Sequence, residues 1–108
     1  MANKQRIEQL EQYLLAEPND PFLKYALAME YMDEDIQKTL HYFENLLNNH
    51  EKYVATYFHA ASLYVGLGEL NKAEEIYKKG IIIANDLKEM HTLKELKAAY
   101  LNFQIEND

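Results

Sequence analysis

Residues 64–80 read YVGLGELNKAEEIYKKG, and the Gly-x-Gly within them fits two different structures. It could be a glycine-rich loop that cradles phosphate in front of a helix, or a tight turn between two helices. A phosphate loop would need a preceding strand, more glycines and usually a Lys-Ser/Thr pair at its end, whereas Glu69 follows here. We therefore expect Gly68 to turn the chain between two helices, with the positive φ that glycine adopts at no steric cost.

Apolar residues recur at spacings of three and four along almost the whole chain, which predicts helices. Breaks at AEPND (16–20), NNHEKY (48–53) and GLGEL (66–70) separate the stripes, and we expect six helices, short connections, no strand and a single domain. Asp20 before Pro21 is a good helix start, and acidic residues 33–35 suit the start of the next helix. Asn71 with Glu74, and Thr92 with Glu95, are predicted capping pairs for the last two helices.

The sequence also repeats itself. Thr39 and Ala73 are 34 residues apart, as are Phe43 and Tyr77, and Leu46 and Gly80. In the helices before them, Leu27, Ala28 and Tyr31 match Ala60, Ala61 and Tyr64 at an offset of 33. This pattern resembles the tetratricopeptide repeat, a helix-turn-helix unit of 34 residues. The resemblance implies a preceding half-repeat helix (3–17), a degenerate first repeat (20–50), a second repeat (54–85) and a capping helix (92–105).

The resemblance further implies an all-α, right-handed superhelical stack of antiparallel helix hairpins, because one hairpin alone leaves an apolar face uncovered. The first repeat departs from the pattern in several places. Lys24 stands where the family usually has a large aromatic residue, and Thr39 stands where it usually has alanine. Glu51 and Asn85 occupy positions where proline is common. The second repeat is the stronger match.

The charge and composition of the chain disfavour some classes of partner and location. The formal net charge of −7 disfavours nucleic acid and would favour a basic protein segment as partner. No apolar run approaches the roughly 18 residues of a membrane span, and MANKQRIEQL lacks the apolar core of a secretory signal. The chain has no cysteine, which fits a cytoplasmic location and excludes disulfides and thiolate sites. The initial Met and the flanking helices suggest a free-standing protein.

Residues with catalytic or metal-binding chemistry are present but poorly arranged for it. His41, His50, His59 and His91 include no pair with the i, i+4 spacing of a helical zinc site. The acidic residues 33–35 suit a helix start better than acid/base work, and Ser62 near His59 has no nucleophile elbow around it. We therefore expect no catalytic residue, no metal and no cofactor, and hence no enzyme.

The resemblance places one residue set on a concave groove that would bind a partner. The set comprises Phe22, Tyr25, Met29, Ala55, Phe58, His59 and Ser62. Family members that clamp a terminal carboxylate use Lys, Arg and Asn there, so Tyr25, Met29 and His59 do not support that activity. Three occupants stay open: a segment of another protein, a second copy of the chain in a homodimer, or the chain's own sixth helix.

The favoured reading is a small adaptor or scaffold that binds a protein or peptide segment. Consecutive Ile81, Ile82 and Ile83 cannot all face one side of a helix, so the corner between the fifth and sixth helices is a second candidate contact surface.

Overall fold

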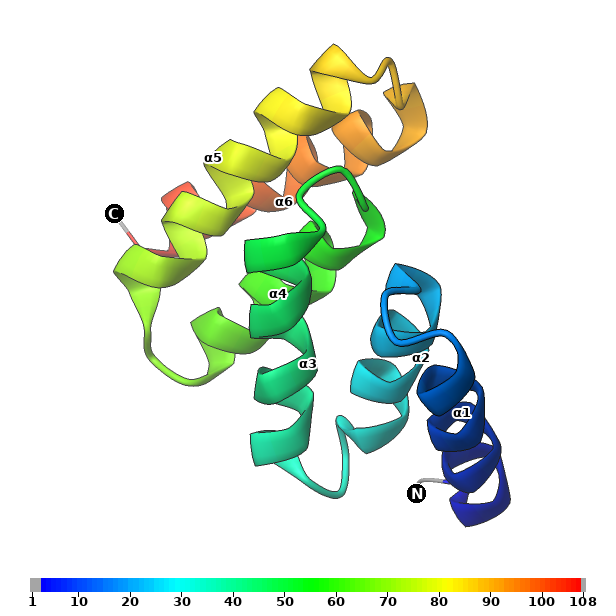
Figure 1. Cartoon of the computed structure of the whole chain (residues 1–108). Helices are drawn as coiled ribbons and strands as arrows, with labels where there is room; N and C mark the ends of the chain where they lie inside the picture. The colour runs from blue at the N-terminus through cyan, green and yellow to red at the C-terminus, as the bar shows by residue number, and fades with distance from the viewer. Residues whose placement is uncertain (1–2, 108) are drawn as a thin grey trace. The chain divides into compact units, whose positions relative to one another are not determined.

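The computed structural model describes residues 3–107, which form six α-helices and no strand (Figure 1). The predicted all-α class is confirmed. The helices are α1 (Lys4–Ala16), α2 (Pro21–Tyr31), α3 (Ile36–Asn49), α4 (Ala55–Gly66), α5 (Leu70–Asp86) and α6 (Met90–Glu106). The chain divides into two compact units, Met1–Tyr53 and Val54–Asp108. The first contains α1–α3 and the second contains α4–α6.

In the first unit, polar side chains begin every helix. Asn3, Asp20 and Asp35 each precede a helix and accept a hydrogen bond from a backbone N–H of its first turn. Pro21 occupies the first turn of α2 beside Asp20, as the sequence predicted. These caps satisfy N–H groups that have no partner within the helix.

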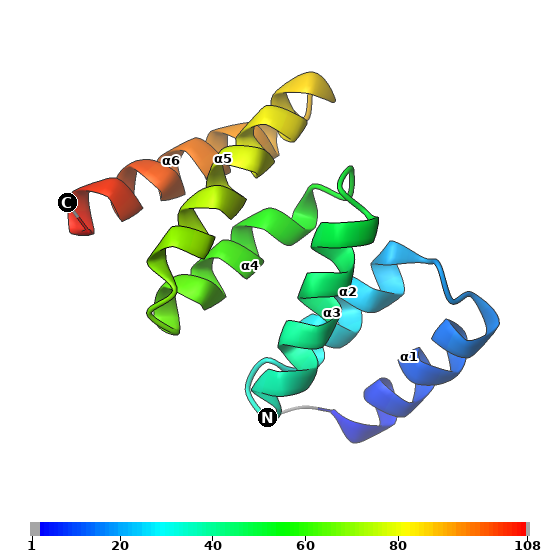
Figure 2. The same ribbon diagram turned by 60° about the vertical axis from the view of Figure 1, so that its left-hand side comes forward.

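The first unit packs as consecutive antiparallel helices, with α2 against both α1 and α3 (Figure 2). Phe43 and Leu46 of α3 are fully buried. Leu14 and Tyr42, which are partly buried, pack against a cluster of buried apolar residues from α1 and α2: Ile7, Leu10, Leu23, Ala26, Leu27 and Tyr31. Burial of each large side chain contributes about 1.5–3 kcal/mol.

Thr39 joins α3 to the end of α2. The N–H of Met32 donates to the Met29 carbonyl, three residues back, which leaves the Ala28 carbonyl to another donor. The buried Thr39 hydroxyl donates to that carbonyl over 3.2 Å, and it also lies 3.3 Å from the Asp35 carbonyl. The threonine that departs from the repeat pattern thus satisfies a buried acceptor at a helix end.

In the second unit, α5 packs against both α4 and α6, and α4 also contacts α6 (Figure 1). Gly80 of α5 lies against Tyr57 of α4, because a Cβ added to this glycine would lie 2.6 Å from the Tyr57 Cβ. The absence of a side chain at Gly80 therefore lets the two helices approach. One turn earlier on α5, Tyr77 packs with Tyr100 and Phe103 of α6, and the three ring centroids are 5.7–6.2 Å apart.

The two turns of the second unit have the same backbone pattern. Gly68 has a φ of 79°, as predicted, and Lys88 takes the equivalent place with a φ of 58°. The residue after each, Glu69 or Glu89, donates its N–H to the carbonyl five residues back. This is a common way to end a helix, and glycine is the usual residue at the left-handed position.

These turns also correct the predicted capping pairs. Helix α5 begins at Leu70 after Glu69, and α6 begins at Met90 after Glu89, with no side-chain capping hydrogen bond at either start. Asn71 and Thr92 therefore lie inside the helices, and the predictions that they are caps were wrong. The left-handed residue fixes where the next helix starts, whichever capping side chain follows.

Candidate functional site

The part of the predicted groove in the first unit lies on one face of α2. Phe22, Tyr25 and Met29 follow one another at spacings of three and four, and Asp20 holds the N–H of Phe22 at 2.9 Å. Phe22 is 53% exposed, whereas Tyr25 and Met29 are half-buried. The Tyr25 ring lies 5.7 Å from that of Tyr53, and burial raises the pKa of both phenols. This face of α2 is therefore an accessible aromatic surface.

The corresponding part in the second unit lies on α4. Ala55 and His59 are half-buried, and Phe58 and Ser62 are exposed, with Phe58 at 36%. The rings of Phe58 and His59 meet edge to face at 5.3 Å. Burial lowers the pKa of His59, while the charge of Glu95 on α6 opposes that shift. At neutral pH the favoured imidazole is thus neutral, next to an exposed aromatic ring.

Helix α6 forms the second wall of a pocket beside Ser62. The pocket has a volume of about 220 Å³. Its lining comes from α4, α5, α6 and the residue after α6: Ser62, Val65, Tyr77, Ala99, Asn102, Phe103, Glu106 and Asn107. In this unit the sixth helix therefore lies beside the α4 surface and leaves a space between them.

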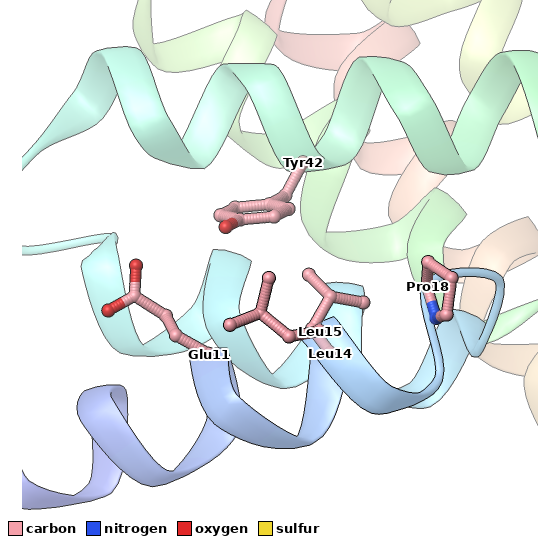
Figure 3. A pocket seen from close by; sticks show the side chains of 5 residues that line it. All are labelled: Glu11, Leu14, Leu15, Pro18 and Tyr42. Carbon is pink, nitrogen blue, oxygen red and sulfur yellow. The ribbon is translucent and has the colours of Figure 1, made fainter.

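Sequence reasoning missed a second, larger pocket of about 470 Å³ between α1 and α3 (Figure 3). The Tyr42 ring projects from α3 toward Leu14 and Leu15 of α1, with Glu11 at one end and Pro18 at the other. Leu15 is 84% exposed. A signal was available, because three successive apolar residues, Tyr13, Leu14 and Leu15, cannot all face the core of one helix.

A buried lysine is the other unforeseen feature of the first unit. Lys24 is 8% exposed, and its Nζ donates to Asn45 Oδ1 at 2.7 Å and lies 3.1 Å from His50 Nε2. Burial, and then the charge of Lys24, lower the pKa of His50, while Asp20 partly opposes the shift. The favoured state is a neutral His50 whose Nε2 accepts from the ammonium group.

Within residues 3–107, no group of three or more His, Asp or Glu side chains is arranged to hold a metal ion. Over the same residues, no helix is both long and apolar enough to cross a bilayer. The described surface thus offers exposed aromatic side chains and pockets lined by both apolar and polar residues.

The antiparallel hairpins α2–α3 and α4–α5, which carry the sequence repeat, define this chain as a helical-repeat protein. It is similar to two structures, one from NMR and one from crystallography, of a tetratricopeptide repeat domain protein from Salinibacter ruber. Their sequence identities to this chain are 37% and 36%, and their TM-scores are 0.74 and 0.75. Each match covers 80% of this chain, and 88% and 97% of the respective neighbour.

The solution structure of a protein from Bordetella parapertussis is also similar, with a TM-score of 0.76 and a sequence identity of 20%. The match covers 94% of this chain and 89% of the Bordetella chain, and at this identity it shows a similar fold alone. No family model and no curated protein sequence matches the chain. Because the identity to the Salinibacter domain is 36–37% over an alignment that covers most of both chains, this chain belongs to the tetratricopeptide repeat family.

Proposed function

We propose that this chain is a non-enzymatic interaction module, an adaptor or scaffold of the cytoplasm, which binds a segment of another protein. The contact residues would be the predicted set on α2 and α4. The observation that carries the proposal is the pair of exposed aromatic rings, Phe22 and Phe58, on the first helices of two repeats in a tetratricopeptide repeat protein. Aromatic side chains that are accessible before binding supply much of the affinity of protein interfaces.

The chemistry of the two faces favours a partner segment with apolar anchors and basic groups. Met29 and Phe22 on α2 offer adaptable apolar contacts. On the second unit, Glu95 is close enough to influence His59, and Glu106 lines the pocket beside Ser62. Negative charge near the apolar contacts would attract basic residues and speed their association.

The test is selection of peptides from a random displayed library, followed by measurement of the dissociation constant by fluorescence polarisation. The double variant Tyr25→Ala/Phe58→Ala is expected to weaken binding by about 30-fold or more, as for a hot spot of about 2 kcal/mol. The control Leu15→Ala/Ile82→Ala removes two exposed apolar side chains elsewhere and should bind like the wild type. Circular dichroism checks that both variants stay helical. If a selected peptide binds Tyr25→Ala/Phe58→Ala as tightly as the wild type but binds Leu15→Ala/Ile82→Ala more weakly, the binding surface lies elsewhere.

Self-association is a second candidate function, and one surface of α6 favours it. Leu101 and Ile105, four residues apart on this helix, are both more than half exposed. Such a stripe could pair with the same stripe of a second copy. Light scattering on the wild type and on Leu101→Ser/Ile105→Ser tests this: a dimer that the double substitution converts to a monomer supports self-association, and a monomeric wild type at high concentration excludes it.

A further inference from the structure

The pocket between α4 and α6 is lined by exposed polar residues and by buried aromatic ones. Ser62, Asn102, Glu106 and Asn107 provide oxygen and nitrogen atoms, and the buried Tyr77 and Phe103 provide rings. The two ring centroids are 5.7 Å apart and the planes are inclined by 50°. Its volume of about 220 Å³ lies below the roughly 300–1,000 Å³ of small-molecule sites, so it suits one side chain better than a whole ligand.

The negative charge around the pocket would favour the binding of a cation. It lies at the carboxyl-terminal end of α6, where the helix dipole carries a partial negative charge. The last turn of α6 has no basic residue, and it carries Glu106. The backbone N–H and the side-chain Nδ2 of Asn107 both donate to the Phe103 carbonyl, so one terminal carbonyl is satisfied while the charge of Glu106 is not balanced there.

The lysine of α5 that follows Tyr77 already has a partner. Lys78 is the basic residue near the Tyr77–Tyr100–Phe103 cluster, but its Nζ lies 3.9 Å from Glu74, whose carboxylate also accepts the Tyr100 hydroxyl at 3.0 Å. Lys78 does not line the pocket. Within residues 3–107, the side-chain carboxylate of Glu106 has no hydrogen bond or ion pair. A partner could therefore supply the missing positive charge.

We propose that this pocket is a subsite for an arginine side chain of the partner segment, with Glu106 as its counter-charge and the Tyr77 and Phe103 rings beside it. Arginine fits better than lysine, because a planar guanidinium can bond a carboxylate with two donors and still lie against an aromatic ring. The side-chain oxygens of Ser62 and Asn102 can accept from the remaining donors. This subsite rests on the proposed function, since it assigns one residue of the segment that the module would bind.

The first experiment is an NMR titration of the full chain with N-acetyl-arginine methylamide. The matched probe is the citrulline compound, which has nearly the same shape and no charge. We expect saturable shifts at the amides of Asn102, Glu106 and Asn107 with the arginine compound, and much smaller ones with citrulline. Glu106→Gln should weaken binding about five-fold, as for one exposed ion pair. Glu75→Gln, an equal loss of charge at an exposed position of α5, should leave binding unchanged.

Equal shifts with both compounds, or equal binding by Glu106→Gln and wild type, would overturn the subsite. The second experiment measures the display-selected peptides against the same two variants. Peptides that bind wild type and Glu106→Gln equally well would overturn the subsite while the proposed function stands. If no peptide binds but the arginine compound does so through Glu106, the proposed function fails and the cation site is supported. Arginine in the selected peptides, with affinity that falls on its replacement by citrulline and on Glu106→Gln, supports both.

Discussion

In the second unit a tyrosine meets a glycine, whereas the residues at the corresponding repeat positions of the first unit are a lysine and a leucine. Tyr57 is almost completely buried, and Gly80 gives it room. In the first unit, Leu46 is fully buried and the slender Lys24 stands at the tyrosine position. Where the second unit has an aromatic ring and no side chain, the first unit thus has two side chains of similar size.

The repeat therefore accommodates two different packing arrangements at the same pair of positions. Close packing tolerates substitutions that conserve volume, and it penalises those that add or remove it. This difference also has an electrostatic consequence, because it brings an ammonium group into the first unit. Lys24 finds Asn45 and His50 there, and the second unit has no corresponding group.

The largest expected effect comes from adding a methyl group to the second pair. In Gly80→Ala, the new Cβ would lie 2.6 Å from the Tyr57 Cβ, 2.8 Å from its Cγ and 3.2 Å from Leu96 Cδ1. The first two atoms sit at the root of the side chain and cannot swing away, so α4 and α5 must separate. We expect the free energy of unfolding to fall by about 2–3 kcal/mol in urea denaturation.

Gly66→Ala is the matched control for that measurement. No atom lies within 4 Å of a Cβ built there, and alanine is favoured over glycine in a helix by up to about 1 kcal/mol. Stability should therefore be unchanged or slightly higher. Similar free energies of unfolding for the two alanine variants would mean that the contact of Tyr57 with Gly80 does not limit the approach of the two helices.

The next effect concerns the position where the first unit has Thr39 and the second has Ala73. Both are fully buried, but Thr39 donates to the Ala28 carbonyl. Thr39→Ala leaves that carbonyl without its donor and opens a small cavity, so we expect a loss of about 2 kcal/mol in the free energy of unfolding. Thr39→Ser keeps the hydroxyl and should lose less. If serine and alanine cost the same, the hydrogen bond does not contribute and the methyl group accounts for the loss.

Much of the fold could be predicted because its signals are local. The spacing of apolar residues gave six helices, Asp20 with Pro21 gave a helix start, and Gly68 gave a left-handed turn. The caps at Asn71 and Thr92 were wrong because the turn residue fixes the helix start. At the second turn that residue is Lys88. Because lysine does not favour a positive φ, nothing in the sequence indicated that the turn would be there.

The candidate sites were predictable only in part. The faces of α2 and α4 follow from the spacing of three and four within one helix, so their residues could be chosen from sequence, and their role as a binding groove stays a prediction. The pocket at Glu106 depends on which face of α6 lies toward α4, and nothing local determines that. Similarly, Lys24 reaches partners 21 and 26 residues away, and only the departure from the usual aromatic residue hinted at such a contact.

The third comparison is between two buried threonines, Thr56 and Thr39. We expect replacement by valine to change the free energy of unfolding in opposite directions at the two positions. The Thr56 hydroxyl is fully buried and has no hydrogen-bond partner among the described residues, and Leu23 stands at the equivalent position of the first unit. Thr56→Val removes the unsatisfied group and keeps the shape, so we expect a gain of up to about 1 kcal/mol in the free energy of unfolding. Thr39→Val, which removes a satisfied hydroxyl, should destabilise. A loss at both positions would show that Thr56 has a partner in solution, such as water.

The smallest expected effect is a change in the pKa of one of two half-buried histidines, His50 and His59. In the folded chain the pKa of His50 is lowered by burial and by Lys24, so the unfolded chain takes up a proton more readily. The stability that this provides is complete above the pKa of an unfolded histidine, about 6.5, and it is lost as the pH falls through the lower pKa of the folded state. Lys24→Met should raise the pKa of His50 without restoring it fully, since burial is the larger cause. Histidine NMR titrations measure this pKa directly. His59 is the internal control, because burial lowers its pKa, Glu95 opposes that shift, and no lysine contributes. A shift of His59 equal to that of His50 in the variant, or none at His50, would show that the ammonium of Lys24 does not act on the imidazole across the 3.1 Å contact.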